Sequence, residues 1–317
     1  MTAKAISQSR PALVRSPWKK DWRENKILYL LFVPVLAYFL IFNYVPMSGI
    51  LMAFQDFKVT KGLLGSEWIG MENFAELIDD EAFLPALRNS FAMAGFNLTL
   101  GFIAPIILAL LITSIKPNPG TRVMQTITYL PNFVSAVVVC SLASQFLDVN
   151  GGITMVLTAM GFEQQNWLAN SDIPVFWLIN TGIGIWQGAG WGSIIYIAAI
   201  YNINGDLHEA AAIDGANRWQ RLLHITLPGI MPMIMMMLTL KIGLVFREGF
   251  DKILLLYMPL TYDTADCLHT YTYRMAFGGM PDYSLSTASG LFQSVIATAL
   301  LIFSNWANKK ATGYALY

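Results

Sequence analysis

Hydrophobic residues in this chain are gathered into six long runs, and short polar segments separate them. The runs cover about 27–54, 89–115, 123–146, 173–201, 229–257 and 287–306. A helix needs roughly 20 apolar residues to cross the hydrocarbon core of a bilayer, and every run reaches that length. The pattern therefore predicts an all-α integral membrane protein with about six transmembrane helices.

The charges of the polar segments predict which side of the membrane each one occupies. Residues 1–26 carry seven basic residues against two acids, whereas the connection at 55–85 carries seven acids against two lysines. Basic segments next to a span stay in the cytoplasm. Thirteen of the 20 Lys and Arg residues fall in segments that this rule places inside. We therefore expect both termini to be cytoplasmic.

These predictions give a simple domain organisation. We expect a cytoplasmic basic tail at 1–26, a transmembrane domain over 27–308 with a cytoplasmic loop at 202–228, and a cytoplasmic C-terminus at 309–317.

The composition supports a chain that is largely solvated by lipid. Of 317 residues, 55% are hydrophobic and only 13% are charged, whereas soluble domains carry about 25% charged residues. The net charge is zero, so nothing favours nucleic-acid binding. The two cysteines, Cys140 and Cys267, and the scattered histidines show no disulfide framework or metal-ligand spacing. We expect no bound cofactor, no metal and no catalytic residue in this chain.

The loop between the fourth and fifth runs, Asp206–Pro228, is the most regular polar segment. Its pattern predicts two short helices joined at Gly215, because glycine readily adopts a positive φ and turns the chain sharply. Pro228 then opens the fifth span at a position that tolerates proline. The alternative is an ordinary amphipathic loop that lies on lipid headgroups. A small-residue face at helical spacing is formed by Leu207, Ala210, Ala211 and Asp214.

The same loop resembles the EAA loop of bacterial ABC-importer permeases, whose pattern is EAA-x3-G-x9-I-x-LP. The matching residues are Glu209-Ala210-Ala211, Gly215 and Ile225-x-Leu227-Pro228. In that family the loop forms a coupling helix that docks in a cleft on a cytoplasmic ATPase subunit. The resemblance implies that Glu209 meets a basic residue of the ATPase and that Gly215 forms the turn. The residues that it assigns to ATPase coupling are Glu209, Ala210, Ala211, Asp214, Gly215, Leu227 and Pro228.

Other motifs narrow the resemblance to carbohydrate importers, in particular those of complex oligosaccharides. They are Asp206-Leu207, Asp214-Gly215-Ala216, Tyr129-Leu130-Pro131, Gly151-Gly152, Asn166-Trp167-Leu168, Phe250-Asp251 and Tyr271-x-Tyr273-Arg274. The family implies a type I ABC-importer architecture in a bacterial plasma membrane. It also implies a second homologous permease subunit, two ATPase subunits and an external solute-binding protein. No G-x4-G-K-[ST] phosphate loop occurs in the chain, so ATP and Mg²⁺ are expected on the separate ATPase subunits.

The fourth run is rich in glycine and offers two interpretations. Gly184, Gly188 and Gly192 are four residues apart, a spacing that lets a second helix pack closely. Alternatively, Gln187 and Trp191 face a cavity in which an indole stacks on a sugar ring. Resemblance to the maltose-type permeases favours Gln187, Gly188 and Trp191 near the substrate.

The fifth run contains charges that are unusual among apolar residues. A charge at the bilayer centre costs at least about 2.5 kcal/mol, so these side chains should face protein or water. They either form ion pairs four residues apart, Arg247 with Asp251 and Glu248 with Lys252, or line the translocation path. The path candidates here are Lys241, Arg247, Glu248 and Asp251. Two cations would suit an acidic sugar such as a uronate oligosaccharide.

We therefore predict the transmembrane subunit of an ATP-driven carbohydrate importer, with an oligosaccharide as substrate. An ion-gradient-driven transporter is one alternative, which explains the intramembrane charges but leaves the EAA loop unexplained. A membrane-embedded enzyme is the other, and it requires a paired-carboxylate or His-rich site that the sequence does not show.

Overall fold

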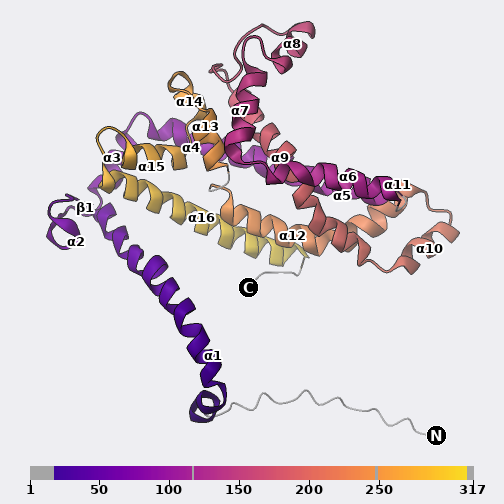
Figure 1. The fold of residues 1–317 in the computed structure, drawn as a ribbon, viewed down its shortest axis with the longest axis horizontal. Helices are drawn as coiled ribbons and strands as arrows, with labels where there is room; N and C mark the ends of the chain where they lie inside the picture. Colours follow the sequence, from indigo (N-terminus) through magenta and orange to yellow (C-terminus); the bar gives the residue numbers. More distant parts are fainter. Residues whose placement is uncertain (1–17, 116–117, 247–248, 313–317) are drawn as a thin grey trace. The chain divides into compact units, whose positions relative to one another are not determined.

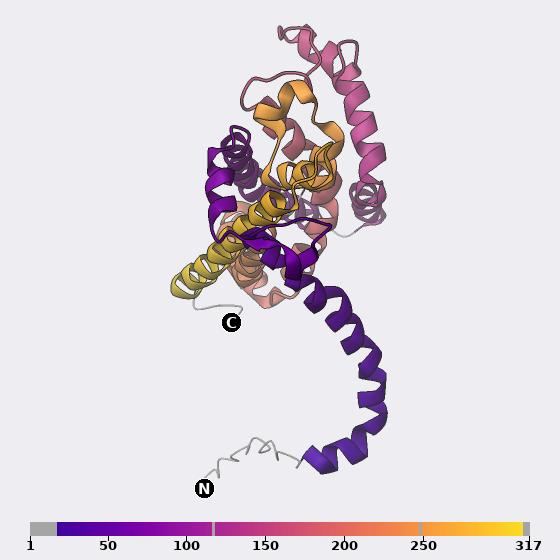
Figure 2. The same ribbon diagram turned by 90° about the vertical axis from the view of Figure 1, so that its left-hand side faces the viewer.

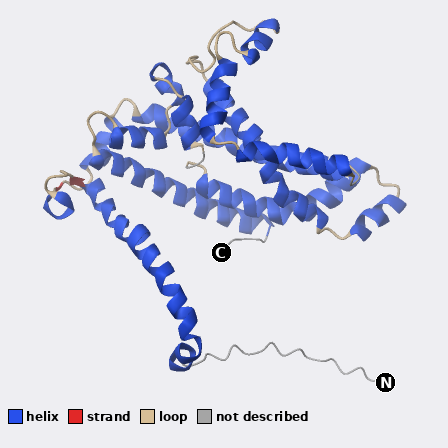
Figure 3. Cartoon of the chain, viewed as in Figure 1, coloured by secondary structure: helices blue, strands red, loops and turns tan. Residues whose placement is uncertain are grey.

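The chain folds into helices in a computed structural model that describes residues 18–115, 118–246 and 249–312 (Figures 1 and 3). Among these residues, six helical stretches are long and apolar enough to cross a membrane, as the hydrophobic pattern predicts. They are Glu24–Phe54, Phe83–Ser114, Ala136–Ala159, Val175–Tyr201, Arg218–Leu244 and Tyr283–Lys310.

The elements follow one another along the chain with short connections. The helices up to residue 159 are α1 (Trp18–Phe39), α2 (Gly62–Gly65), α3 (Glu72–Asp79), α4 (Phe83–Phe96), α5 (Phe102–Ser114), α6 (Pro119–Tyr129), α7 (Ala136–Leu147) and α8 (Gly152–Ala159). The later helices are α9 (Val175–Tyr201), α10 (Gly205–Ile213), α11 (Arg218–Arg221), α12 (Leu227–Leu244), α13 (Phe250–Leu256), α14 (Tyr262–Ala265), α15 (Leu268–Phe277) and α16 (Tyr283–Thr312). A short antiparallel hairpin pairs β1 (Gln55–Asp56) with β2 (Glu67–Trp68).

The chain divides into two compact units, one ending at Leu51 and the other beginning at Met52. The first unit contains α1, which is kinked at Asn25 (φ −112°, ψ 18°). The apolar side chains of its span are exposed, which suits a helix that is surrounded by lipid or by a partner. The second unit holds all the other spans and is described below.

Three prolines within the spans follow a widened, π-helical turn. These are Pro46 after η1 (Leu40–Tyr44), Pro105 after η3 (Asn97–Gly101) and Pro228 after η5 (Leu222–Thr226). A proline lacks the N–H of a regular helix and clashes with the carbonyl one turn earlier, so a widened turn makes room for its ring. In η5 the N–H of Leu227 bonds to the carbonyl of Leu222.

This widened turn corrects the predicted role of Pro228. The helical stretch runs without a break from Arg218 to Leu244, so Pro228 lies inside it and does not begin the span. The second and sixth spans also begin earlier than predicted. Their helices, α4 and α16, start at Phe83 and Tyr283 instead of residues 89 and 287.

The predicted third and fifth spans are interrupted, which the hydrophobic pattern did not reveal. Between α6 and α7 lies a 3₁₀ turn, η4 (Leu130–Phe133), that contains Pro131. The Ser135 hydroxyl then accepts a bond from the N–H of Val138 and caps α7. In the fifth span, α12 ends at Leu244, and α13 begins after Gly249, whose φ is +82°. The residues around Pro131 stay apolar, whereas the break at Gly249 lies among the charges of the fifth run.

Helix α9 packs against both α5 and α6, and the three lie side by side in Figure 1. A Cβ at Gly190 would lie 1.8 Å from the carbonyl oxygen of Thr128, so the two backbones touch. The predicted packing stripe is correct only in part, because Gly190 lies outside it and Gly192 is the member that approaches a neighbouring helix closely (3.2 Å from its Cβ position to Pro105 of α5). A Cβ at Gly188 would meet nothing within 4 Å, while Gly184 and Gly192 face the side chains of Lys252 and Pro105.

Helices α12 and α16 also run side by side, in both Figure 1 and Figure 2. The buried Asn308 on α16 donates from Nδ2 to the carbonyl of Met235 (3.3 Å) and to Oγ1 of Thr239 (3.2 Å). A polar bond between apolar helices fixes their register, because the amide would otherwise be left unpaired.

Candidate functional site

The predicted coupling segment forms α10, a helix that stands on the surface of the second unit. No residue of Gly205–Ile213 is buried. The Asn204 side chain caps its start by accepting from the N–H of Asp206 (3.0 Å). Leu207 and Ile213 are 53% and 87% exposed. The whole of α10 is therefore accessible from solvent.

The end of α10 is closed by a turn centred on Gly215, whose φ is +81°. The N–H of Ala216 bonds to the carbonyl of Ala211 (2.8 Å), and the N–H of Gly215 bonds to that of Ala212 (3.2 Å). This pair of bonds is the Schellman motif, which needs a left-handed residue at the position of the glycine. The predicted sharp turn at Gly215 is confirmed.

The second helix of the loop begins immediately after this turn. Asn217 and Gln220 form a capping box, with bonds of 2.9 Å and 2.7 Å between each side chain and the other's N–H. A groove of about 390 Å³ lies between the two helices, lined by Ala211, Asp214, Gly215, Ala216, Gln220, Arg221, His224 and Ile225. Acidic side chains lie on the α10 side of the loop and basic ones on the α11 side.

The two stems of the loop meet beneath it. A Cβ at Gly229 would lie 2.8 Å from Cδ1 of Ile203, so α12 passes directly against the end of α9. Leu227 packs with Ile203 against a buried cluster that includes Ile197 and Ile230. Leu227 therefore belongs to the stem, whereas Glu209, Ala210 and Asp214 lie on the exposed part.

Two of the predicted path residues on α9 lie beside the connection between α6 and α7. Gln187 is half-buried and donates from Nε2 to the carbonyl of Val134 (2.9 Å). Trp191 is exposed, and its ring lies 5.5 Å from that of Phe133. Gly188 lies between them with open space at its Cβ position. The structure thus brings Gln187 and Trp191 to the break at Pro131, a neighbourhood that sequence spacing did not predict.

The predicted path residues of the fifth span are separated by the break near Gly249. Lys241 is half-buried in the last turn of α12, and Asp251 is exposed at the start of α13. Arg247 and Glu248 lie outside the described residues, and so do the two predicted ion pairs that involve them. The ammonium of Lys252 lies 3.5 Å from the Cβ position of Gly184, so α13 brings a cation to α9.

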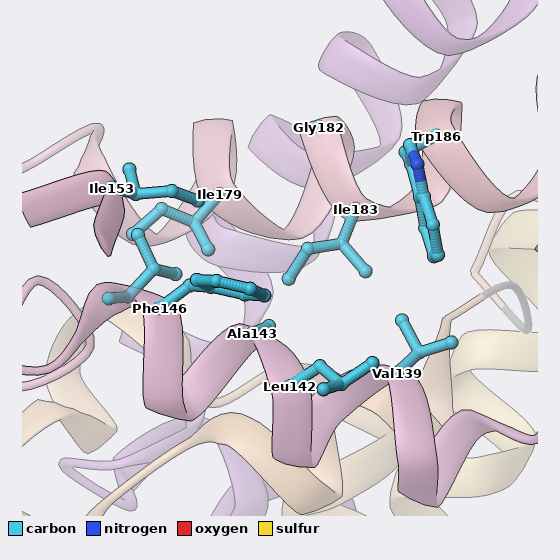
Figure 4. Close-up of a pocket in the computed structure, with 10 residues that line it drawn as sticks. Val139, Leu142, Ala143, Phe146, Ile153, Ile179, Gly182, Ile183 and Trp186 are labelled. Carbon is cyan, nitrogen blue, oxygen red and sulfur yellow. The ribbon is translucent and has the colours of Figure 1, made fainter. Parts of the chain in front are cut away.

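An apolar cavity of about 500 Å³ lies between α7 and α9 (Figure 4). Val139, Leu142 and Phe146 of α7 face Ile183 and Trp186 of α9 across it. Sugar hydroxyls must keep hydrogen-bond partners when they leave water, and this lining offers almost none. The cavity therefore suits lipid or apolar side chains better than a glycan.

A buried polar network between spans five and six was missed by sequence reasoning. Asp266 is 2% exposed, and its carboxylate lies 2.6 Å from Nη1 of Arg274 and 2.5 Å from the Thr270 hydroxyl. The guanidinium also covers the ring of Tyr262, at 4.6 Å. Burial raises the pKa of Asp266, and the Thr270 hydroxyl and Arg274 oppose this only in part.

Long-range bonds tie this network to the beginning of the second span. The Tyr271 hydroxyl donates to Asp80 (2.6 Å), and the Asn89 amide donates to the carbonyls of Asp263 (2.9 Å) and Asp266 (2.8 Å). The motif Tyr271-x-Tyr273-Arg274 stood out in the sequence, but the partner of Tyr271, Asp80, is 191 residues away along the chain. Only the fold could identify them.

Comparison with known proteins decides the family. Residues 101–310 match the family described as "Binding-protein-dependent transport system inner membrane component". The chain belongs to this family. It is the multi-pass transmembrane permease subunit of an ABC importer, which favours the ATP-driven prediction over the ion-driven transporter and the membrane-embedded enzyme.

Similar proteins cover nearly the whole permease. It is 36% identical to the polygalacturonan/rhamnogalacturonan transport system permease protein YteP of Bacillus subtilis (strain 168), over 99% of this chain and 100% of the relative. It is 38% identical to protein LplB of the same organism, over 92% of each chain. It also resembles a solved bacterial ABC transporter that imports the acidic polysaccharide alginate, with a TM-score of 0.85, 38% identity and coverage of 93% and 99%.

Proposed function

We propose that this permease forms the translocation path for an acidic oligosaccharide and is driven by ATP hydrolysis on separate ATPase subunits. The observation that carries the coupling part is α10, an exposed helix with its own caps and no buried residue. The substrate part is supported by similar proteins that transport polygalacturonan/rhamnogalacturonan and alginate. The chain itself performs no catalysis, and ATP and Mg²⁺ are held by the ATPases.

In this proposal α10 docks on an ATPase subunit through Glu209, Ala210, Ala211 and Asp214. Local caps keep the helix rigid when its partner pushes on it. Its stems close where Gly229 meets Ile203, so the movement reaches α9 and α12 together. The coupling loop is thereby joined to the two helices that carry candidate path residues.

The proposed path is lined by side chains near the two helix breaks. Gln187, Gly188 and Trp191 lie at the break between α6 and α7, while Lys241 and Asp251 flank the break in the fifth span. Arg247 and Glu248 complete the proposed set. Cations in a path bind carboxylates of a uronate chain, and hydrogen-bonding side chains replace water at its hydroxyls.

The proposal includes the partners and the orientation expected from the sequence. The permease pairs with a second, homologous permease subunit and receives substrate from an external solute-binding protein. A solved alginate transporter has been captured with an alginate-bound periplasmic protein, and this chain resembles its permease at 36% identity with a TM-score of 0.86. Both termini lie in the cytoplasm of the bacterium, with the tail at 1–26, the coupling loop at 202–228 and the end at 309–317.

The coupling proposal is tested by Glu209→Ala in the complete importer. We expect the yield of co-purified ATPase, or the ATP hydrolysis stimulated by binding protein, to fall roughly tenfold, because truncating one partner of an interfacial charge pair is costly. Glu163→Ala is the matched control, since Glu163 is also exposed but lies on the outer connection. Unchanged assembly and unchanged hydrolysis in Glu209→Ala would show that α10 does not couple through this carboxylate.

The substrate proposal is tested by uptake into proteoliposomes that contain the complete importer and its binding protein. The panel consists of galacturonate oligomers, alginate oligomers and neutral malto-oligosaccharides. We expect ATP-dependent uptake of a uronate oligomer. Uptake of neutral oligomers alone would contradict the acidic substrate and leave the importer assignment intact.

A further inference from the structure

Four aromatic rings form a continuous row on α13 and α15, which we call the aromatic ladder. His269, Tyr273 and Phe277 are four residues apart and lie on one face of α15. Phe250, the first residue of α13, lies at the foot of the row. Its ring is 5.1 Å from His269 and 5.7 Å from Tyr273, and Tyr273 is 5.0 Å from Phe277.

The ladder runs along the first half of α16. The two helices are antiparallel, because Gln293 pairs with His269 (2.9 Å), Ser289 with Thr272 (2.8 Å) and the N–H of Asp282 with the carbonyl of Met275 (2.9 Å). At about 1.5 Å per residue, Gln293 lies ~15 Å along α16 from its start. Phe277, at one end of the ladder, is therefore level with the beginning of span six. Phe250, at the other end, lies next to the break in span five.

The two faces of α15 have different environments. Leu268 and Tyr271 are fully buried, and the latter bonds to Asp80. On the ladder face, by contrast, Tyr273 is 41% exposed and Phe277 is 71% exposed. Long-range bonds hold one side of the helix, so the rings on the other side are presented in a fixed orientation.

The chemistry of the ladder suits a glycan better than it suits lipid. A lipid-facing stripe needs no polar group, but here the foot contains His269 bonded to Gln293, which also donates to the carbonyl of Phe246 (3.2 Å). Sugar rings have apolar C–H faces that stack on aromatic rings and hydroxyls that need hydrogen-bond partners. Tyr273 and Phe277 are one helical turn apart, about 6 Å, which is comparable to the length of one sugar unit in a chain.

The ladder is also continuous with the proposed path. Phe250 immediately follows Gly249 at the break of the fifth span, and Asp251 and Lys252 come next on α13. Lys252 reaches the Cβ position of Gly184 on α9. A chain that slides down the ladder would therefore arrive at the helices that carry the candidate path residues.

We propose that Phe250, His269, Tyr273 and Phe277 form a stacking track for successive sugar rings between the outer side of the permease and the break in span five. The occupant is an oligosaccharide of several units, which stacks on Tyr273 and Phe277 and hydrogen-bonds near His269 and Gln293. This inference rests on the proposed function, because the track is useful only to an importer of glycans.

The test uses Tyr273→Ala and Phe277→Ala in the complete importer, with saturating binding protein, in proteoliposomes. The readout is the number of oligosaccharides imported per ATP hydrolysed, for the disaccharide and the pentasaccharide of each glycan in the panel above. We expect this ratio for the pentasaccharide to fall roughly three- to tenfold in each variant. In Phe277→Ala, the number of disaccharides imported per ATP should fall less than that of pentasaccharides, because a disaccharide is too short to stack on both Tyr273 and Phe277. Binding-protein-stimulated ATP hydrolysis should persist, since the coupling loop is intact.

Two further variants separate stacking from general damage. Tyr273→Phe keeps the ring and should import almost as wild type. Phe303→Ala removes a ring that is 62% exposed on α16, away from the ladder, and should also import normally. An equal fall in Phe303→Ala, or loss of the second permease subunit from the purified ladder variants, would overturn the track in favour of a lipid or subunit contact.

The outcome also distinguishes the two proposals. If the wild type imports a glycan and the ladder variants import it equally well, the track is wrong while the proposed function stands. If the wild type imports no member of the panel, the proposed function fails and the track fails with it.

Discussion

The proposed coupling loop, which holds α10 and α11, is stabilised in the opposite way to the segment around α14 and α15, which is proposed to lie on the outer side and is here called the outer segment. In the loop, the capping and turn bonds join residues that lie within five positions of one another, as between Ala216 and Ala211. In the outer segment, the bonds that matter join residues far apart in sequence, such as Tyr271 with Asp80 and Leu268 with Ser90. The loop is exposed, whereas Asp266, Thr270 and Tyr271 are buried.

The difference teaches which region can change without loss of the fold. Removing a side chain from α10 leaves no cavity and no unpaired buried group, so its variants should lose coupling and keep stability. Removing a buried polar group from the outer segment leaves its partners unsatisfied, and this is among the larger costs that a single substitution can have.

The largest expected effect comes from Asp266→Asn in the outer segment. The change puts an amide NH2 group, which cannot accept, in the place of one of the two carboxylate oxygens, which face the Thr270 hydroxyl and Arg274 Nη1. A buried donor is then left unsatisfied, which we expect to destabilise the fold by about 3 kcal/mol. The apparent melting temperature of the purified importer should fall clearly. The matched control is Asp263→Asn, which removes an exposed pair with Arg88 (3.3 Å) and should cost less than about 1 kcal/mol. Equal effects would mean that burial does not decide the stability of this segment.

A second test replaces one asparagine by alanine in each of the two regions. Asn89→Ala removes the Asn89 donor to the buried carbonyl of Asp266 and one of the two donors to the carbonyl of Asp263, which keeps Arg88. We expect a loss of about 2 kcal/mol. Asn217→Ala removes an exposed helix cap in the coupling loop, which should cost about 1 kcal/mol or less. Thermal unfolding of the two variants side by side measures the difference, and a larger loss in Asn217→Ala would reverse the comparison.

Gly215→Ala should affect coupling more than global stability. Space is open around Gly215, but its φ of +81° disfavours any residue with a Cβ, by about 1 kcal/mol. We expect the end of α10 to loosen, so that ATP hydrolysis continues with less import per ATP. Gly95→Ala, where space is open and φ is helical, is the control. A melting temperature lowered as far as in Asp266→Asn would contradict the local character of the loop.

The smallest effect is a pH dependence from Asp266. Burial raises the pKa of this carboxyl above its ordinary value of 3.8, so the folded state holds the proton more tightly than the unfolded state. Its contribution to stability is therefore greatest below the ordinary pKa and falls as pH rises through the window up to the raised value. The melting temperature of wild type, measured against that of Asp266→Asn over this window, should decline slightly with rising pH. A rising difference would show that the pKa is lowered instead.

Prediction from sequence succeeded where the determining physics is local. Six spans follow from apolar length alone, and the turn at Gly215 follows from the conformational freedom of glycine. The interruption at Pro131 was missed, because the residues around it are as apolar as the rest of the span. The one at Gly249 was missed because the charges beside it were interpreted as ion pairs or path residues within a continuous span. Packing at Gly190 was missed for a related reason, since a repeat of glycines does not say which of them meets a neighbouring backbone.

By itself, the sequence determined the membrane class of this permease, its six spans and the turn at Gly215 in the loop after span four, since apolar runs and turns act over a few residues. The tertiary structure alone decided that α16 runs antiparallel to α15 and packs against it. It also decided that Asp266 meets Arg274 in a buried network and that Phe250 contacts the rings of α15. Those arrangements depend on contacts between residues far apart in the chain, and their energies exist only once the helices have packed.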